Sequence, residues 1–180
     1  MDVSAPKWLP EFFPVNPWQQ DTYEALYRLF ERDFKKSQPV YEGRAVWFFP
    51  EMENGKEKIF WHLTSREDKK VGERPPDLRR SERLPWVRPM LDHPEKPEVL
   101  AWDHKEGDGA VKTYVWLEDY DFVVIMKKYP DGRRRLITSF WVEYGNTKQK
   151  LKKKYSRSIL ARKQKRPTRN VGPTPSTMGG

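Results

Sequence analysis

The sequence predicts an α+β domain built on an antiparallel sheet of about six strands. One amphipathic helical pattern near the N-terminus is followed by runs of strand-like residues, not by alternating strands and helices. Two such runs flank a turn sequence and form a central hairpin. A basic helical pattern follows near the C-terminus. We expect the N-terminal helix and a short middle helix to pack on the sheet, before a basic C-terminal helix and a disordered tail.

The central hairpin carries two adjacent hydroxyls. Its arms are Phe122–Met126 and Leu136–Tyr144, both β-branched and apolar, and Tyr129–Gly132 supplies a proline, an aspartate and a glycine for the turn. Neighbouring residues on a strand point to opposite faces, so only one of Thr138 and Ser139 can face the core. Either both are ordinary polar residues of a sheet, or one of them serves chemistry.

The N-terminal part divides into an extended segment and a helix. Residues 1–16 are rich in proline and aromatic residues and should lie along the domain, with docking to a partner as the alternative. Asn16 and Pro17 fit the cap and first position of a helix that runs to Lys35 and covers one face of the sheet. Its apolar stripe consists of Tyr23, Leu26, Tyr27, Phe30 and Phe34.

Two further runs predict a second hairpin. Ala45–Phe49 and Lys58–Leu63 are strand-like, and Glu51–Glu57 contains Asn-Gly, a strong hairpin turn. His62 then lies at the end of a strand, where site residues commonly emerge, and its side chain can exchange a proton near neutral pH. The alternative is a half-buried histidine bonded to the backbone.

A short helix with two arginines follows a polar loop. Thr64–Pro76 should be a mobile loop, and Asp77 can cap a helix that Pro85 ends. Arg80 and Arg83 are three residues apart and share a helical face, which fits a phosphate clamp because guanidinium binds phosphate through paired hydrogen bonds. A solvated helix face is the alternative. The remaining strands are predicted at Glu98–Trp102 and Lys112–Leu117.

The excess positive charge is concentrated at the C-terminal end. Of the net charge of +9, residues 147–180 supply eleven Lys and Arg with no Asp or Glu, which indicates an arm that binds polyanions. Residues 147–166 fit a helix capped at Asn146 and Thr147, with an apolar stripe of Leu151, Tyr155 and Ile159, and residues 167–180 should be disordered. The candidate RNA-binding residues are Lys148, Lys150, Lys152, Lys153, Lys154, Arg157, Arg162 and Lys163.

Several classes of protein are disfavoured by composition. The chain has no Cys and only three His, which argues against a structural zinc site and a cysteine nucleophile. It contains no nucleotide-binding glycine motif and no serine-hydrolase elbow, so we expect no metal and no cofactor. No apolar run approaches the ~20 residues of a membrane span, and the first residues lack a signal-peptide pattern. We therefore expect a cytoplasmic protein.

The remaining polar groups fit metal-free cleavage of RNA. A histidine can remove the 2′-OH proton, arginines can stabilise the phosphorane, and a hydroxyl can hold a phosphate oxygen. His62, Arg80, Arg83 and either Thr138 or Ser139 would supply those groups. RNA provides its own nucleophile, so no serine or cysteine triad is required.

The chain also resembles the phage- and plasmid-associated members of the barnase, EndoU, colicin and RelE-like (BECR) ribonuclease superfamily. The resemblance spans roughly Tyr41 to Tyr155 and rests on Lys56–Leu63, Asp77–Trp86, Trp102, Tyr114–Leu117, Leu136–Phe140 and the basic Lys150–Tyr155. It implies a nuclease domain over residues 17–146 with a curved antiparallel sheet, and it implicates His62, Arg80, Arg83 and a hydroxyl. Relatives often show two threonines or a Ser-Thr pair where this chain has Thr138-Ser139, so which hydroxyl is used stays open.

The leading hypothesis is therefore an endoribonuclease toxin that cuts tRNA or mRNA, free or bound to the ribosome. It would leave a 2′,3′-cyclic phosphate, and an inhibitory antitoxin or other partner would restrain it. One alternative is a non-catalytic nucleic-acid-binding module, and another is an interaction protein whose basic arm binds an acidic partner.

Overall fold

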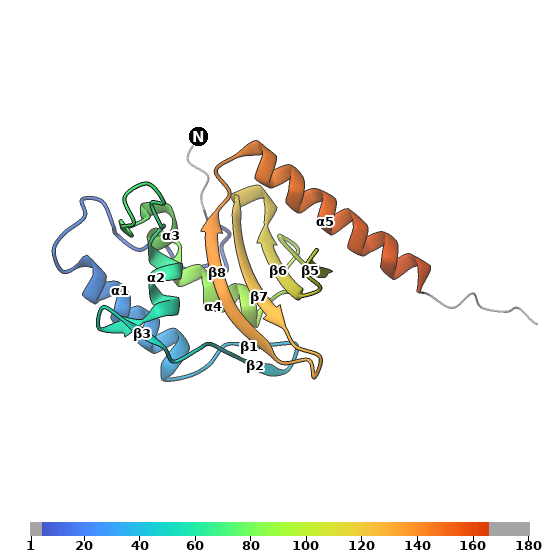
Figure 1. Cartoon of the computed structure of the whole chain (residues 1–180), viewed down its shortest axis with the longest axis horizontal. Helices are drawn as coiled ribbons and strands as arrows, with labels where there is room; N and C mark the ends of the chain where they lie inside the picture. The colour runs from blue at the N-terminus through green and yellow to red at the C-terminus, as the bar shows by residue number, and fades with distance from the viewer. Residues whose placement is uncertain (1–4, 166–180) are drawn as a thin grey trace, which may run out of the picture.

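The computed structural model describes residues 5–165, so the predicted tail at 167–180 lies outside it. It has a mixed α+β fold, as the sequence predicts (Figure 1). One curled sheet contains, in order across it, β1 (Val40–Tyr41), β2 (Arg44–Trp47), β8 (Arg134–Trp141), β7 (Phe122–Lys128), β6 (Val111–Leu117) and β5 (Val99–Lys105).

The predicted hairpin, β7–β8, occupies the middle of the sheet. Its arms pair antiparallel from Phe122 opposite Trp141 to Lys128 opposite Arg134, with a bulge beside Ile125. Gly132 closes the turn with a φ of +87°, which a residue with a side chain rarely adopts. One expectation was wrong: the sheet is not wholly antiparallel, because β2 pairs parallel with the start of β8.

The predicted strand at Lys58–Leu63 is also wrong, because these residues form the helix α2 (Lys58–Thr64). Ile59, Phe60 and Leu63 are buried at helical spacing, so tertiary packing overrides their preference for a strand. The Asn-Gly turn is correctly placed, but the strands it joins, β3 (Met52–Glu53) and β4 (Lys56–Glu57), are only two residues long and form a separate small sheet.

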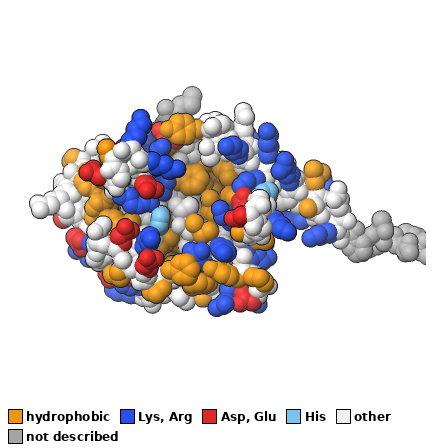
Figure 2. Space-filling model, in the orientation of Figure 1, with side chains coloured by type: hydrophobic (Ala, Val, Ile, Leu, Met, Phe, Trp, Pro, Cys, Tyr) orange, Lys and Arg blue, Asp and Glu red, His pale blue; other side chains and the backbone are white. Residues whose placement is uncertain are grey.

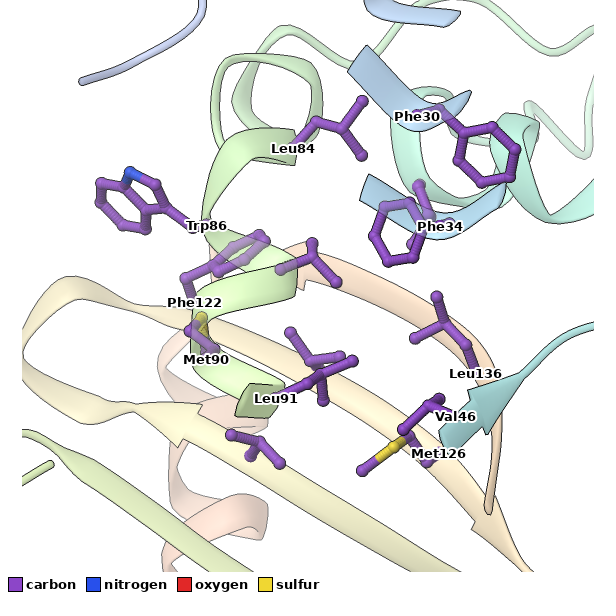
Figure 3. Close-up of a cluster of buried hydrophobic side chains, with 14 of the residues drawn as sticks. Phe30, Phe34, Val46, Leu84, Trp86, Met90, Leu91, Phe122, Met126 and Leu136 are labelled. Carbon is purple, nitrogen blue, oxygen red and sulfur yellow. The ribbon is translucent and has the colours of Figure 1, made fainter. Parts of the chain in front are cut away.

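Helix α4 (Leu84–Asp92) lies behind the sheet in Figure 1, and its boundary differs from the predicted one. Pro85 stands in the first turn of α4 and does not end the preceding helix, because proline is tolerated where no intrahelical donor is needed. Helix α1 (Thr22–Phe30) begins five residues after Pro17 and continues as a π-helical turn, η1 (Glu31–Lys35). Helix α1 packs against α4, and its Phe30 and the Phe34 of η1 belong to the main core cluster, part of which Figure 3 shows.

A second apolar cluster occupies the opposite face of the sheet. It contains Trp102, Tyr114, Trp116 and Val123, and α5 (Gly145–Gln164) covers part of it with Leu151 and Tyr155, as the stripe predicts. The helix begins before the predicted cap residues, at Gly145. A short 3-10 turn, η2 (Glu118–Tyr120), joins β6 to β7.

The N-terminal segment lies along the domain, as expected. The Phe13 amide donates to the Glu82 carbonyl at 2.8 Å, Trp86 Nε1 donates to the Pro10 carbonyl at 3.0 Å, and Phe12 stacks on Trp86.

Candidate active site

Three of the predicted site residues meet around the C-terminal end of α2. His62 lies on α2 and not at a strand end. Arg80 Nη1, from the helix α3 (Leu78–Glu82), donates to the His62 carbonyl at 2.8 Å, and Thr138 Oγ1, from β8, donates to the same oxygen at 3.4 Å. The last carbonyls of a helix lack intrahelical partners, so these donors satisfy the carbonyl and fix the position of His62.

The helix that presents Arg80 begins as the sequence predicts. Asp77 accepts a hydrogen bond from the Arg80 amide at 3.0 Å, which is the usual contact of a capping aspartate. Asp77 also pairs with Arg80 Nε at 3.4 Å. Burial lowers the pKa of Arg80, and Arg74 and Arg66 lower it further, whereas Asp77 opposes the shift.

The side chain of His62 is bound by an arginine that the sequence did not single out. Arg74 Nη2 lies 2.9 Å from His62 Nδ1. A guanidinium has only donors, so Nδ1 must accept and Nε2 must carry the ring proton. Burial lowers the pKa of His62, and nearby positive charges, Arg74 first among them, lower it further. His62 is therefore neutral near pH 7, with its lone pair on Nδ1.

Not all of the hydrogen-bond donors of Arg74 have an acceptor among the described residues. Its Nη1 is buried and has no hydrogen-bond partner among the described residues, and within residues 5–165 Arg74 makes no ion pair with a carboxylate. Its neighbours Arg66 and Arg80, by contrast, pair with Glu143 and Asp77. A buried N–H of a cation without an acceptor is costly, and an anion placed between Arg74 and Arg80 would satisfy it. The cluster therefore has the charge and the donors of a phosphate site.

Arg83 does not join this cluster. The predicted phosphate clamp of Arg80 and Arg83 is wrong, because the two side chains have different surroundings. The Arg83 side chain hydrogen-bonds Glu82 and donates to the Arg79 carbonyl at 3.1 Å. Its guanidinium lies 4.8 Å from the ring centroid of Phe12, under the N-terminal segment. The short helix ends at Glu82, so Arg83 is the residue between two helices and does not extend the face that carries Arg80.

The two hydroxyls are separated as strand alternation requires. Ser139 stands opposite Val124, a residue of the main core cluster, and therefore faces that core. Its side chain is 0% exposed, and its Oγ has no hydrogen-bond partner within the described part of the chain. Thr138 is partly exposed and contacts the His62 carbonyl. The structure thus brings together His62, Arg80 and Thr138, and it leaves Ser139 in the core.

A groove of about 1220 Å³ adjoins the cluster at Arg80. The loop 65–76, α3, the end of β8 and the start of α5 line it, and two isolated bridges, Ser65–Pro76 and Asp68–Glu73, shape the loop. Figure 2 shows Lys and Arg side chains gathered over α3 and this loop. The groove combines cations with aromatic side chains, including Arg79 4.9 Å from the ring centroid of Trp141. Its basic and aromatic lining residues are Arg66, Lys69, Lys70, Arg79, Arg80, Phe140, Trp141 and Tyr144.

The basic residues of α5 fall into two groups. Lys148, Lys152 and Lys154 form ion pairs with Asp121, Glu118 and Glu106, at 2.8, 3.2 and 3.0 Å, so they attach the helix to the sheet. Among the described residues the other predicted RNA-binding side chains have no carboxylate partner and are exposed: Lys150, Lys153, Arg157, Arg162 and Lys163. These five remain available to a polyanion.

No protein-family model, curated protein or solved structure shows significant similarity to this chain. The resemblance to the BECR ribonucleases therefore remains a hypothesis from sequence motifs. Within residues 5–165, no group of three or more His, Asp or Glu side chains is placed to hold a metal ion, and no helix is long and apolar enough to cross a membrane.

Proposed function

We propose that this protein is an endoribonuclease that cleaves RNA at the cluster formed by His62, Arg74, Arg80 and Thr138. The observation that supports it most is the bond from Arg74 to His62 Nδ1, made by a guanidinium whose other nitrogen is buried without an acceptor. A phosphodiester placed there would receive hydrogen bonds from Arg74 and Arg80 while it lies beside a neutral histidine.

In the proposed reaction the 2′-oxygen of the RNA attacks the adjacent phosphorus. The phosphate draws Arg74 Nη2 away from Nδ1, and the exposed lone pair of Nδ1 takes the 2′-OH proton. The P–O5′ bond breaks, the 5′-oxygen takes a proton from solvent, and the products are a 2′,3′-cyclic phosphate and a 5′-OH end. Arg74 and Arg80 stabilise the charge that develops on the phosphorane.

The lowered pKa of His62 suits this role. A general base must be unprotonated before it acts, and burial together with Arg74 keeps the ring neutral at physiological pH. Thr138 and Arg80 bind the backbone of His62, so they position the base through the end of α2. Such an activity inside a cell requires restraint, and an inhibitory partner protein, together with toxicity in its absence, is part of the proposal.

The test compares cleavage of a single-stranded RNA oligonucleotide by wild type, His62→Ala, Arg74→Gln and the control His93→Ala. His93 is exposed, and among the described side chains it hydrogen-bonds only Glu95, so its loss should leave the rate unchanged. Loss of a general base should lower kcat by roughly 10²–10⁴-fold, and loss of an arginine that stabilises the transition state by roughly 10²–10³-fold.

Circular dichroism and thermal denaturation of each variant show whether the fold is kept. A folded His62→Ala variant that cleaves RNA at the wild-type rate would overturn the assignment. RNA binding without cleavage by the wild-type protein would favour the non-catalytic alternative.

A further inference from the structure

A row of cations crosses the sheet on the face that α5 partly covers. Arg135, Lys127 and Lys112 stand directly opposite one another on the adjacent strands β8, β7 and β6. Each lies two residues along its strand from a member of the second apolar cluster or a residue packed against it, so all three point to that face. With strands ~4.8 Å apart, the row is about 10 Å long.

This row has no ion-pair partner within residues 5–165, although the charge of Lys112 reaches Glu106 and helps to lower its pKa. Within residues 5–165, Lys112, Lys127 and Arg135 make no ion pair with a carboxylate. On the opposite face of the same strands the cations are paired: Lys128 binds Asp103 at 2.7 Å, and Arg134 binds Glu42 at 3.1 Å. Like charges directly opposite on neighbouring strands destabilise a sheet. Repulsion between the aligned cations therefore remains on the face toward α5, whereas ion pairs with carboxylates offset it on the opposite face.

An aromatic cluster lies at the β8 end of the row. Trp47 contacts both Phe49 and Tyr129, with ring centroids 5.3 and 5.6 Å apart. The Arg135 guanidinium lies 4.1 Å from the ring centroid of Phe49, and Lys127 Nζ lies 5.2 Å from that of Tyr129. Phe49 is 48% exposed, so its ring can be reached from solvent. Figure 2 shows hydrophobic side chains next to Lys and Arg over the lower ends of β7 and β8.

We propose that the row Lys112–Lys127–Arg135 and the aromatic cluster of Trp47, Phe49 and Tyr129 form a binding face for a single strand of nucleic acid. Cations in a line neutralise successive phosphates, and an exposed aromatic ring gives an unpaired base a surface on which to stack. An acidic peptide would use the cations but not the aromatic cluster, so the combination favours a polynucleotide.

The face also extends the proposed active site. Thr138, which contacts His62, lies three residues along β8 from Arg135, or about 10 Å away. The row runs across the strands and Thr138 lies along β8 from its end, so a strand bound on the row would turn along β8 to reach His62. This last step rests on the proposed function, whereas binding to the row does not.

The test measures binding of a 2′-O-methyl oligonucleotide, about ten nucleotides long, at several salt concentrations. This probe has no free 2′-OH, so the proposed reaction cannot cleave it and binding is separated from catalysis. The main variant is Lys112→Gln/Lys127→Gln. Its control is Lys7→Gln/Lys36→Gln, which removes the same charge from exposed lysines outside the sheet.

Each phosphate contact contributes a salt slope of roughly −0.7, so loss of two contacts should flatten the slope by about 1.4. By the same relation, the ratio of wild-type to variant affinity should be about 25-fold larger at 0.1 M salt than at 1 M. The main variant should also melt at a higher temperature than wild type, because two opposed like charges are removed. Phe49→Ala should weaken binding about tenfold through lost stacking without changing the slope.

Affinity and slope within error of wild type in the folded Lys112→Gln/Lys127→Gln variant would overturn the proposal. So would an equal loss in the control, or polyglutamate that binds as tightly as the oligonucleotide through the same lysines. If His62→Ala still cleaves RNA but the row variants lose binding, the active-site assignment fails and the binding face stands.

Discussion

Replacing Ser139 with alanine should stabilise the protein and leave RNA cleavage unchanged. The hydroxyl is fully buried and has no hydrogen-bond partner among the described residues. Leaving a buried polar group unsatisfied costs about 1–3 kcal/mol, and alanine removes that group with little change in volume. Because the lost atom leaves a small void, we take the lower end and expect a gain of about 1 kcal/mol. For a domain of this size this raises Tm by about 2–4 °C.

Thr138→Val is the matched comparison, since it removes the neighbouring hydroxyl and keeps the shape of the side chain. Thr138 Oγ1 donates to the His62 carbonyl at 3.4 Å, a long bond, and Arg80 still holds that carbonyl at 2.8 Å. We expect a loss of stability of about 0.5 kcal/mol and a lower kcat, because the end of α2 is held less firmly.

Urea denaturation gives the free energy of unfolding of both variants, and initial rates on one RNA oligonucleotide give their activity. If Ser139→Ala instead loses more than about 1 kcal/mol, its Oγ has a partner that the structure does not show. If it loses cleavage by tenfold while it remains folded, the assignment of Thr138 as the hydroxyl of the site is refuted.

Three further predictions concern metal, pH and α5. Cleavage should persist in EDTA because Arg74 and Arg80 supply the positive charge at the phosphate, and a loss that magnesium restores would contradict this. The pKa of His62 is lowered in the folded state, so the unfolded chain binds more protons just below pH 6.5, and stability should fall as pH drops through that value. Urea denaturation at about pH 7.5 and 5.5 should show a smaller difference for His62→Gln than for wild type, and an equal difference would count against a neutral His62. On α5, Gln at three of the five exposed cations without a carboxylate partner among the described residues, Lys150, Lys153 and Arg157, should weaken RNA binding at low salt. The salt slope should flatten by roughly 0.7 per contact while Tm is kept, and an unchanged slope would exclude the helix from binding.

The sequence predicts the centre of the fold well because local and global signals agree there. The β7–β8 hairpin combines β-branched arms with a glycine that the turn requires, and the Asp77 cap and the α5 stripe are likewise local patterns. Lys58–Leu63 shows the opposite case. Its aromatic and β-branched residues favour a strand, but burial of Phe60 and Leu63 on one side makes it a helix.

The candidate site is only partly predictable, because tertiary structure and not local sequence decides which side chains meet there. Strand alternation indicates that one of Thr138 and Ser139 faces away from the core, but which one depends on the register with β7. Arg74 lies in a loop without periodicity, and only the folding of that loop brings it to His62. The row Lys112–Lys127–Arg135 joins three strands, so it exists only once their register is known. The spacing of Arg80 and Arg83 misleads because the helix ends between them.

The ends of the cleaved RNA test the central claim most directly. Mass spectrometry of the products from a defined single-stranded oligonucleotide identifies the group on each new end. Attack by the 2′-oxygen, with His62 Nδ1 as base and Arg74 and Arg80 on the phosphate, predicts a 2′,3′-cyclic phosphate on one fragment and a 5′-OH on the other. A 3′-OH and a 5′-phosphate would mean that water is the nucleophile, and would contradict the account.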